Sequence, residues 1–265
     1  MDTYVLAFDA DKTLNPEYMQ KPLFDYFGLS DDEWNGFWQE KDDNKKKLLN
    51  NGLIVDGNIL WLNKIIDYAN NDVFPGLSNN LLMELGREIK FFPGIPEFFD
   101  NLKKETGADI EYYVITSGLR KMLQGSVIND YVNEIYGCEL LERDGVVSEV
   151  GFSVDYTNKT RFLFAITKGG LEIVNDRVND KRVRWHNMIY IGDGPSDIPC
   201  FEIVKNKGGK SIAVYDPDYE ESLINAKKLM NDKRVDDYFK ADYRPKSGLY
   251  NYLKKLVSSL ISDPD

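Results

Sequence analysis

Short apolar runs alternate with helical stretches along the chain, and this alternation limits the possible folds more than any other feature. Such runs are predicted as buried strands, the last of them weakly, at 4–8, 111–118, 187–194, 210–215 and 238–243. Helices are predicted between or after them, at about 119–131, 160–170, 195–206 and 247–261. Strands separated by helices favour an α/β fold with a mainly parallel sheet.

One long stretch interrupts the alternation. Residues 15–90 carry three tryptophans and apolar residues with helical spacing, but no convincing strand. We therefore predict an inserted helical subdomain at 15–90 and a core formed by 1–14 and 91–265. A smaller, hairpin-like insert within the core is predicted at 138–156, where apolar residues recur with a period of two.

The charge balance argues against polyanionic partners. The sequence has 33 basic and 44 acidic residues, which gives a net charge of −11. A broad basic face for nucleic acid or an anionic membrane is therefore not expected, although a small phosphate ester needs only a local positive site. No stretch approaches a membrane-spanning length of about 18 apolar residues. Because the N-terminus also lacks the pattern of a signal peptide, we expect a cytoplasmic protein.

Two residue types with versatile chemistry are scarce. The single His186 leaves little room for imidazole catalysis. The two cysteines, Cys138 and Cys200, are too few for a disulfide framework or a zinc site. Acid–base work in this chain would therefore fall to carboxylates or lysines.

Two aspartates directly follow the first predicted strand, in the order Asp9-Ala10-Asp11-Lys12-Thr13. Ligand sites of open α/β sheets lie at the carboxyl ends of the strands. Phosphoryl transfer through a covalent aspartyl phosphate needs one carboxylate as nucleophile and another as proton shuttle. The pair fits that chemistry, and an acidic turn or cap is the alternative explanation.

Two weaker signatures follow downstream. Thr116, Ser117 and Gly118 end the second predicted strand, where hydroxyl and backbone N–H groups at a helix N-terminus can bind an anion. Thr or Ser also caps ordinary helices, so this signature alone is weak. Lys159 opens a predicted helix, where its charge opposes the helix dipole unless an anion is near, and Lys168 is an alternative candidate.

A glycine-flanked aspartate follows the third predicted strand. Asp193 lies between Gly192 and Gly194, so its backbone can approach a ligand closely, and Asp197 follows in the same turn. Together with Asp9, these carboxylates offer the hard oxygen ligands that Mg²⁺ takes. A well-capped helix start is the alternative explanation.

These signatures, in this order along alternating strands, resemble the haloacid dehalogenase (HAD) superfamily over about 1–14 and 91–215. The helical insert stands where that superfamily places a C1-type cap, and the likeness is strongest to phosphoserine-phosphatase-like members. The resemblance implies a three-layer α/β/α Rossmann-like core and the activity of a Mg²⁺-dependent phosphatase.

The resemblance also implies catalytic roles for the matching residues. Asp9 would attack phosphorus as the nucleophile, and Asp11 would protonate the leaving oxygen and then activate water. Lys159 would neutralise charge between the nucleophile and the phosphoryl group. The phosphoryl oxygens would be bound at the end of the second strand, by Thr116, Ser117 and Gly118.

A metal site is implied by the same resemblance. Mg²⁺ would be bound by the Asp9 carboxylate, the Asp11 backbone carbonyl and Asp193. Asp197 would support the ion directly or through water. The sequence does not distinguish Mg²⁺ from Mn²⁺.

Substrate-recognition residues match the subfamily less well. The second signature reads Thr-Ser-Gly-Leu where Ser-Gly-Gly is common, and only Glu17 could stand for the acidic cap residue that binds an amino group. Arg87 is a candidate for binding a substrate carboxylate. Aromatic residues of the insert could stack on a base or sugar, although packing in the cap core is more common at their spacings, namely Trp34, Phe37, Trp38 and Trp61. Phosphoserine is therefore not carried over as the substrate.

The leading hypothesis is a Mg²⁺-dependent phosphatase that hydrolyses a small phosphorylated metabolite through an aspartyl phosphate on Asp9. A phosphotransferase or mutase would use the same site, and a catalytically silent regulatory binding protein could use the same fold. Nucleic acid and membranes are not expected as partners. The sequence does not indicate the oligomeric state.

Overall fold

One mixed sheet forms the centre of the core. In the computed structural model, which describes residues 2–262, it has seven strands in the order β4-β3-β2-β1-β5-β6-β7. The strands are β1 (Thr3–Phe8), β2 (Asp109–Leu119), β3 (Glu134–Arg143), β4 (Val146–Phe152), β5 (Met188–Gly192), β6 (Lys210–Tyr215) and β7 (Asp237–Lys240). Neighbouring strands are parallel except for β3 and β4. The predicted α/β fold with a mainly parallel sheet is therefore confirmed.

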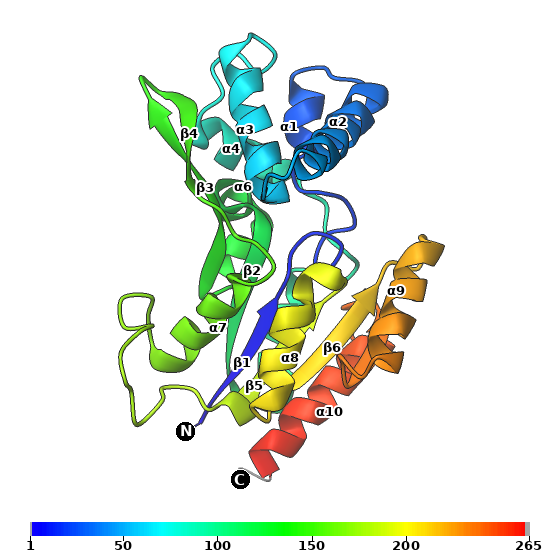
Figure 1. Cartoon of the computed structure of the whole chain (residues 1–265). Coiled ribbons are helices and arrows are strands. Elements are labelled where there is room, and N and C mark those ends of the chain that lie inside the picture. The colour runs from blue at the N-terminus through cyan, green and yellow to red at the C-terminus, as the bar shows by residue number, and fades with distance from the viewer. Residues whose placement is uncertain (1, 263–265) are drawn as a thin grey trace.

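Helices cover both faces of this sheet and complete the three layers. α7 (Lys159–Lys168) packs against α8 (Ile198–Asn206), and α10 (Gly248–Ser262) packs against α5 (Glu97–Thr106). Figure 1 shows α7 and α8 on the near side of the sheet. α9 (Glu220–Asn231) packs against β6 and β7 at one edge.

The central strands are buried on both faces. Five of the six residues of β1 and all five of β5 are buried. Their sequences are continuous apolar runs because helices exclude water from both sides of a parallel sheet. The Tyr243 hydroxyl donates a hydrogen bond of 2.8 Å to the Thr13 carbonyl, so core packing also positions the loop after β1. Tyr243 belongs to a cluster of core rings with Phe8, Phe98, Phe99 and Tyr112.

Helices occupy the predicted insert between β1 and α5. They are α1 (Lys21–Tyr26), α2 (Asp31–Asn50), α3 (Gly57–Asn70), α4 (Asn79–Leu85) and the short 3₁₀ helix η1 (Gly86–Glu88). Ser30 and Glu33 form a capping box at the start of α2, and Asp56 caps α3. We keep 15–90 as the proposed extent of this cap. The helices lie together at the end of the molecule above β1 (Figure 1).

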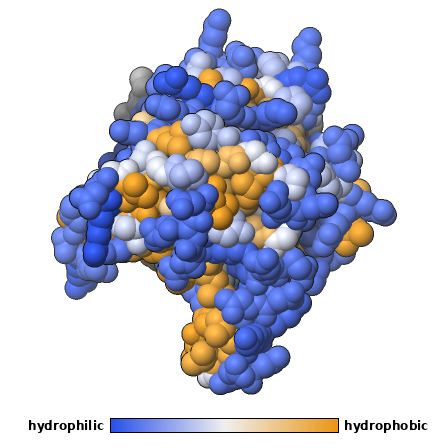
Figure 2. All heavy atoms as spheres, turned by 90° about the horizontal axis from the view of Figure 1, so that it is seen from above, coloured by the Kyte–Doolittle hydropathy of each residue, from blue (hydrophilic) through white to orange (hydrophobic). Residues whose placement is uncertain are grey.

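The surface agrees with the charged composition. Seen from above, the cap end is mostly hydrophilic, with hydrophobic residues gathered in its middle (Figure 2). No helix within residues 2–262 has the length and apolar character needed to cross a membrane.

A β-hairpin ties the cap to the core. β3 begins at Glu134, before the predicted insert, because its first residues pair with β2 in the core sheet. Its later residues pair with β4, and this hairpin reaches the cap (Figure 1). There, Val147 N donates to the Leu77 carbonyl at 2.9 Å, and Asn79 Nδ2 donates to the Leu140 carbonyl at 3.0 Å.

Two glycines allow a second contact between cap and core. A Cβ atom at Gly125, the last residue of α6 (Arg120–Gly125), would overlap the Met83 carbonyl of α4. A Cβ atom at Gly86 would likewise overlap the Met122 carbonyl of α6. The backbones of the two segments therefore lie in direct contact, and only glycine permits this separation.

Replacing Gly125 with Ala is expected to lower the free energy of unfolding by about 1–3 kcal/mol, because the added methyl group forces α4 and α6 apart. Gly36→Ala is the matched control, since a Cβ atom at this position in α2 meets no atom within 4 Å. The control is expected to raise stability by about 0.5–1 kcal/mol. Urea denaturation measures both changes, and equal effects at the two sites would contradict the close contact.

Several bounds differ from the predicted ones. The helix predicted at 119–131 is divided into α6 and the 3₁₀ helix η2 (Val127–Asp130). Ser126 ends α6 because its backbone is extended and its hydroxyl donates to the Leu123 carbonyl at 2.7 Å. α9 was not predicted, and the strand predicted at 238–243 is the shorter β7.

Candidate active site

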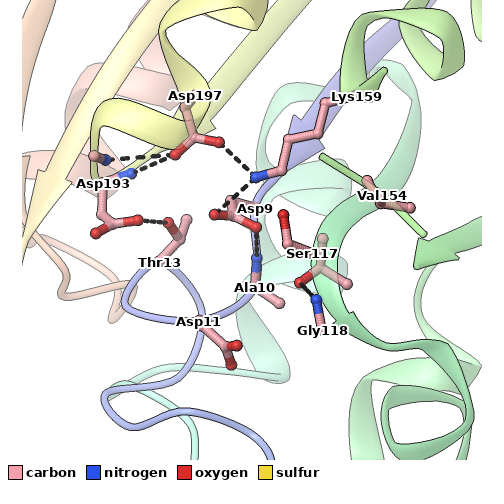
Figure 3. A network of polar contacts seen from close by, with 12 residues as sticks. Asp9, Ala10, Asp11, Thr13, Ser117, Gly118, Val154, Lys159, Asp193 and Asp197 are labelled. Carbon is pink, nitrogen blue, oxygen red and sulfur yellow. Dashed lines mark hydrogen bonds and ion pairs between the residues drawn. The ribbon is translucent and has the colours of Figure 1, made fainter. Parts of the chain in front are cut away.

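The predicted site residues come from elements that meet at one edge of the sheet. Asp9 follows β1, Thr116 lies near the end of β2, and Asp193 follows β5. Since β2, β1 and β5 are neighbours and parallel, their carboxyl ends lie side by side. Lys159, the first residue of α7, reaches the same place (Figure 3).

A buried ion-pair network connects the nucleophile candidate to α7. Lys159 is fully buried, and its Nζ lies 3.0 Å from Asp9 Oδ2 and 2.8 Å from Asp197 Oδ1. Burial lowers the pKa of Lys159, but the attraction of Asp197 and Asp9 outweighs it, so the net pKa is raised. This lysine is therefore a fixed positive charge beside Asp9. Lys168, the alternative candidate, lies at the other end of α7 and donates to the carbonyls of Val174 and Asp176.

The Asp197 carboxylate accepts hydrogen bonds from several groups of the site. Its Oδ1 accepts hydrogen bonds of 2.8 Å from Lys159 and from the Tyr190 hydroxyl. Its Oδ2 accepts from the backbone N–H groups of Asp193 and Gly194, at 3.2 and 3.4 Å. Both oxygens are therefore engaged by protein donors, so this carboxylate positions the lysine and the turn after β5.

Gly192 makes this arrangement possible. A Cβ atom at Gly192 would overlap the Asp197 carboxylate. The first glycine of the Gly-Asp-Gly motif therefore makes room for the buried Asp197 carboxylate behind the turn. The sequence alone points to close approach of a ligand as the reason for the flanking glycines, whereas in the structure Gly192 makes room for Asp197.

Three carboxylates gather where a metal ion could bind. Oxygen atoms of Asp9, Asp193 and Asp197 lie within 4.8 Å of one another. Burial, reinforced by the neighbouring carboxylates, raises the pKa of Asp9 and that of Asp193. A divalent cation would relieve this repulsion, and an all-oxygen donor set suits Mg²⁺. The residues therefore fit the implied metal.

The Asp11 carboxylate does not join this group. Its Oδ1 accepts hydrogen bonds from Asn15 Nδ2 at 2.8 Å and from Met19 N at 2.9 Å. Figure 3 shows it directed away from Lys159 and Asp197. Burial raises the pKa of Asp11 to about 6, in opposition to these two hydrogen bonds. A carboxyl group in this state can exchange a proton near neutral pH.

The backbone after Asp11 turns sharply. Lys12 has a φ of 64°, in the left-handed region that a lysine seldom adopts. Thr13 follows, and its hydroxyl donates to Asp193 Oδ1 at 3.4 Å. The turn thus lets Asp11 and Thr13 face different parts of the site.

The signature at Thr116 differs from its predicted local structure. β2 continues to Leu119, with an irregularity after Ile115, so these residues lie in a bulged strand and not at a helix N-terminus. Gly118 N donates to Thr116 Oγ1 at 3.0 Å and is therefore already engaged. The buried Ser117 Oγ has no hydrogen-bond partner among the described residues, and it remains available to a ligand.

A cavity of about 340 Å³ lies over these groups. Its core side includes Asp9, Asp11, Thr116, Ser117, Asp193, Gly194, Pro195 and Ser196. Its cap side includes Tyr18, Gln20, Trp38, Lys41, Asn58 and Trp61. Most of the predicted phosphate and metal residues therefore share one cavity with residues of the cap, whereas Gly118 and Asp197 do not line it.

Two predicted substrate residues do not line this cavity. Arg87 lies in η1 with its side chain exposed, and the structure does not bring it to Asp9. Glu17 lines a different cavity of about 580 Å³, on the side of the loop that carries Asn15. The spacing of these residues in the sequence does not reveal either position.

Several residues of the site carry no clear signal in the sequence, or a signal for a different role. The spacing of Trp38 and Trp61 favours packing in the cap core, yet both line the cavity. Gln20 and Lys41 are ordinary polar residues in the sequence, and no pattern marks either of them as a site residue. Tyr190 lies inside an apolar strand, and its buried hydroxyl was the one hint that it needs a polar partner.

Comparisons with known proteins agree with this fold. No family model matches the sequence. An uncharacterized protein of Borreliella burgdorferi is 31% identical over a 278-residue alignment, which covers 95% of this chain and 95% of that protein. A HAD family hydrolase from Salmonella enterica serovar Typhi has a similar structure, with a TM-score of 0.61 and 17% identity over 94% of this chain and 69% of that one.

A phosphoserine phosphatase solved as an analogue of its phospho-aspartyl intermediate is also similar. The TM-score is 0.56 and the identity 16%, over 96% of this chain and 99% of that one. The chain therefore has the fold of the HAD superfamily, in its phosphoserine-phosphatase-like form. Within that fold, it belongs to the same family as the Borreliella burgdorferi protein.

Proposed function

We propose that this chain is a phosphatase that hydrolyses a small phosphomonoester through a covalent phosphate on Asp9. The observation that carries the proposal is the position of the Asp9 carboxylate. It lines the cavity, and a buried lysine lies 3.0 Å from one of its oxygens. A carboxylate held beside a fixed positive charge can approach an anionic phosphoryl group.

The first half-reaction transfers the phosphoryl group to the protein. An Asp9 oxygen forms a bond to phosphorus while the bond from phosphorus to the leaving oxygen breaks. Asp11 gives a proton to that leaving oxygen, which departs as an alcohol. Lys159 and the hydroxyl groups of Thr116 and Ser117 stabilise charge on the phosphoryl oxygens.

The second half-reaction restores the protein. Water gives a proton to the Asp11 carboxylate and attacks the phosphorus of the aspartyl phosphate. The bond between phosphorus and Asp9 breaks, and inorganic phosphate leaves. A divalent cation held by Asp9 and Asp193, with Asp197 behind them, would lower the cost of bringing two anions together.

Activity is expected to depend on the metal. Phosphate release from a panel of phosphate esters should be lost in EDTA and restored by Mg²⁺ or Mn²⁺ in excess. An isomerised ester without phosphate release would instead support a mutase. Turnover that persists in EDTA would contradict the metal site, and no release from any ester would contradict the phosphatase.

The metal is also expected to stabilise the fold. Mg²⁺ at about 100 times its dissociation constant should raise the free energy of unfolding by about 2.7 kcal/mol, because only the folded chain brings the carboxylates together. Asp193→Asn should remove most of this gain. Asp72→Asn is the control, since Asp72 is exposed and its left-handed backbone suits Asn. Equal Mg²⁺ stabilisation of both variants would place the ion elsewhere.

A further inference from the structure

The cap builds the side of the cavity opposite the phosphoryl-transfer groups. The residues of this cap wall come from the loop before α1, from α2 and from α3, namely Tyr18, Gln20, Trp38, Lys41, Asn58 and Trp61. A phosphoryl group that reaches Asp9 leaves the rest of the ester facing this wall. The residues of the cap wall therefore contact the leaving group, and their chemistry indicates which leaving group fits.

Two polar atoms on the cap wall have no hydrogen-bond partner. Gln20 is only 2% exposed, and its Oε1 has no donor within residues 2–262. In the same part of the chain, the buried Nε1 of Trp38 has no acceptor. Buried polar groups are almost always paired in folded proteins. Because both residues line the cavity, a ligand that offers a donor to Gln20 and an acceptor to Trp38 would pair both atoms once the two side chains turn slightly towards it.

Asn58 differs from these two residues because its side chain is already engaged. Its Nδ2 donates to the Val154 carbonyl at 2.7 Å, and its Oδ1 accepts from Trp61 Nε1 at 3.4 Å. Asn58 thereby holds α3 and the Trp61 ring against the segment after β4. We therefore treat it as a positioning residue of the cap wall.

The cap wall is also aromatic. The ring of Trp38 lies 5.0 Å from that of Tyr18 and 6.1 Å from that of Trp61, measured between centroids. Lys41 Nζ lies 5.6 Å from the Trp38 centroid. Flat rings with polar atoms at their edges bind flat polar ligands well. Trp34 packs 5.5 Å from Trp38 in the same cluster but does not line the cavity.

The volume of the cavity agrees with a ring-sized leaving group. At about 340 Å³ it falls in the range of roughly 300–1,000 Å³ that is typical of pockets for drug-sized ligands. A three-carbon leaving group bound at Asp9 would leave much of the cap wall in contact with water. A planar ring would cover Trp38 and reach Gln20.

We propose that the substrate is a phosphate ester whose leaving alcohol carries a planar heterocycle, bound against Trp38 and hydrogen-bonded to Gln20. This inference rests on the proposed phosphatase function. The shared chemistry occurs in two kinds of ester. In pyridoxal 5′-phosphate the ring carries the phosphorylated hydroxymethyl group, whereas in nucleoside 5′-monophosphates a sugar separates the ring from the phosphate.

The experiment compares phosphate release from both kinds of ring-bearing ester with release from serine phosphate and glycerol 3-phosphate, in Mg²⁺. At least one ring-bearing ester is expected to exceed both aliphatic esters by about 100-fold in kcat/KM. Comparing pyridoxal 5′-phosphate with nucleoside 5′-monophosphates shows which of the two kinds of ring-bearing ester is preferred. An aliphatic ester that matches or exceeds every ring-bearing ester overturns the inference.

Variants test the named contacts. Trp38→Phe keeps a ring but loses the N–H group, and Gln20→Met keeps the length but loses the amide. Each is expected to raise KM for the preferred ester about tenfold, with kcat little changed, because one hydrogen bond to the leaving group is lost. Trp34→Phe is the matched control and should leave KM unchanged. An unchanged KM in both cavity variants overturns the assignment of these contacts.

Binding separates this inference from the proposed function. Asp9→Asn protein is titrated with each ester in Mg²⁺ and the heat of binding is measured. If a ring-bearing ester binds but wild-type protein releases no phosphate from it, the proposed function fails while the inference stands. If wild-type protein hydrolyses esters but Asp9→Asn binds no ring-bearing one, the inference fails while the function stands.

Discussion

Asp9→Asn is expected to lower kcat by a factor of about 10⁴ or more while the protein stays folded. The amide keeps the shape of the carboxylate, but it lacks the anionic oxygen that would form the bond to phosphorus. Losses of roughly this size accompany removal of a nucleophile from an enzyme whose groups act together. The measurement is phosphate release in Mg²⁺ under saturating ester.

The Asp9→Asn variant is expected to stay folded. Lys159 keeps its contact of 2.8 Å with Asp197 and retains a buried counter-charge. Circular dichroism and urea denaturation of Asp9→Asn should therefore resemble those of Asp72→Asn, the exposed control. A variant that keeps both its fold and its turnover would exclude Asp9 as the nucleophile.

Asp11→Asn distinguishes the two aspartates. This variant keeps the nucleophile but lacks the group that exchanges protons, so the covalent phosphate should form slowly and be hydrolysed more slowly still. Protein quenched in acid after incubation with a ³²P-labelled ester should then retain label in Asp11→Asn and none in Asp9→Asn. Label in both variants would indicate attachment at another residue.

The sequence predicted the strands and their ends because the central elements are simple. β1 and β5 are continuous apolar runs, each stopped by the residues that carry chemistry, Asp9 and Asp193. A parallel sheet brings such ends to one edge, so the meeting of these groups follows from fold class alone. Lys159 was found because a cation at a helix start is unfavourable without an anion nearby.

Other parts of the site depend on tertiary contacts that no local pattern records. The bulge at Thr116 results from pairing between β2 and β3, so it was mistaken for a helix start. Asp197 has all its acceptor positions filled by groups from α7, β5 and its own turn. The motif around Asp193 also predicts a metal ligand at Asp197, so the positioning role of Asp197 could not be predicted from the sequence.

The cap wall was the hardest part to predict. Trp34 and Trp38 are one helical turn apart in α2, and an aromatic stripe at this spacing usually forms a helix core. Which of the two rings lines the cavity depends on how α2 packs against α3 and the loop at Tyr18. Arg87 differs in the opposite direction. Its charge and its place in the sequence suit a residue that binds substrate, but its side chain is exposed and does not line the cavity.

Lys159→Met is expected to lower the free energy of unfolding of the metal-free protein by about 3–5 kcal/mol. The side chain is fully buried, and its removal leaves Asp9 and Asp197 without their shared counter-charge. Breaking one partner of a buried ion pair costs about this much because the other charge stays buried and unpaired. Lys168→Met is the control at the other end of α7. It should cost about 1 kcal/mol, since its partners are backbone carbonyls at the surface.

A double-mutant cycle shows whether the cost arises from the ion pair. Asp197→Asn removes one of the two charges that Lys159→Met leaves unpaired, so the double variant should be more stable than the sum of the single losses predicts. Urea denaturation in EDTA measures all four proteins. A coupling of at least about 1 kcal/mol would show that Lys159 acts through Asp197. Additive losses would show that the lysine stabilises the fold by the packing of α7 alone, and its place beside Asp9 would then need a different explanation.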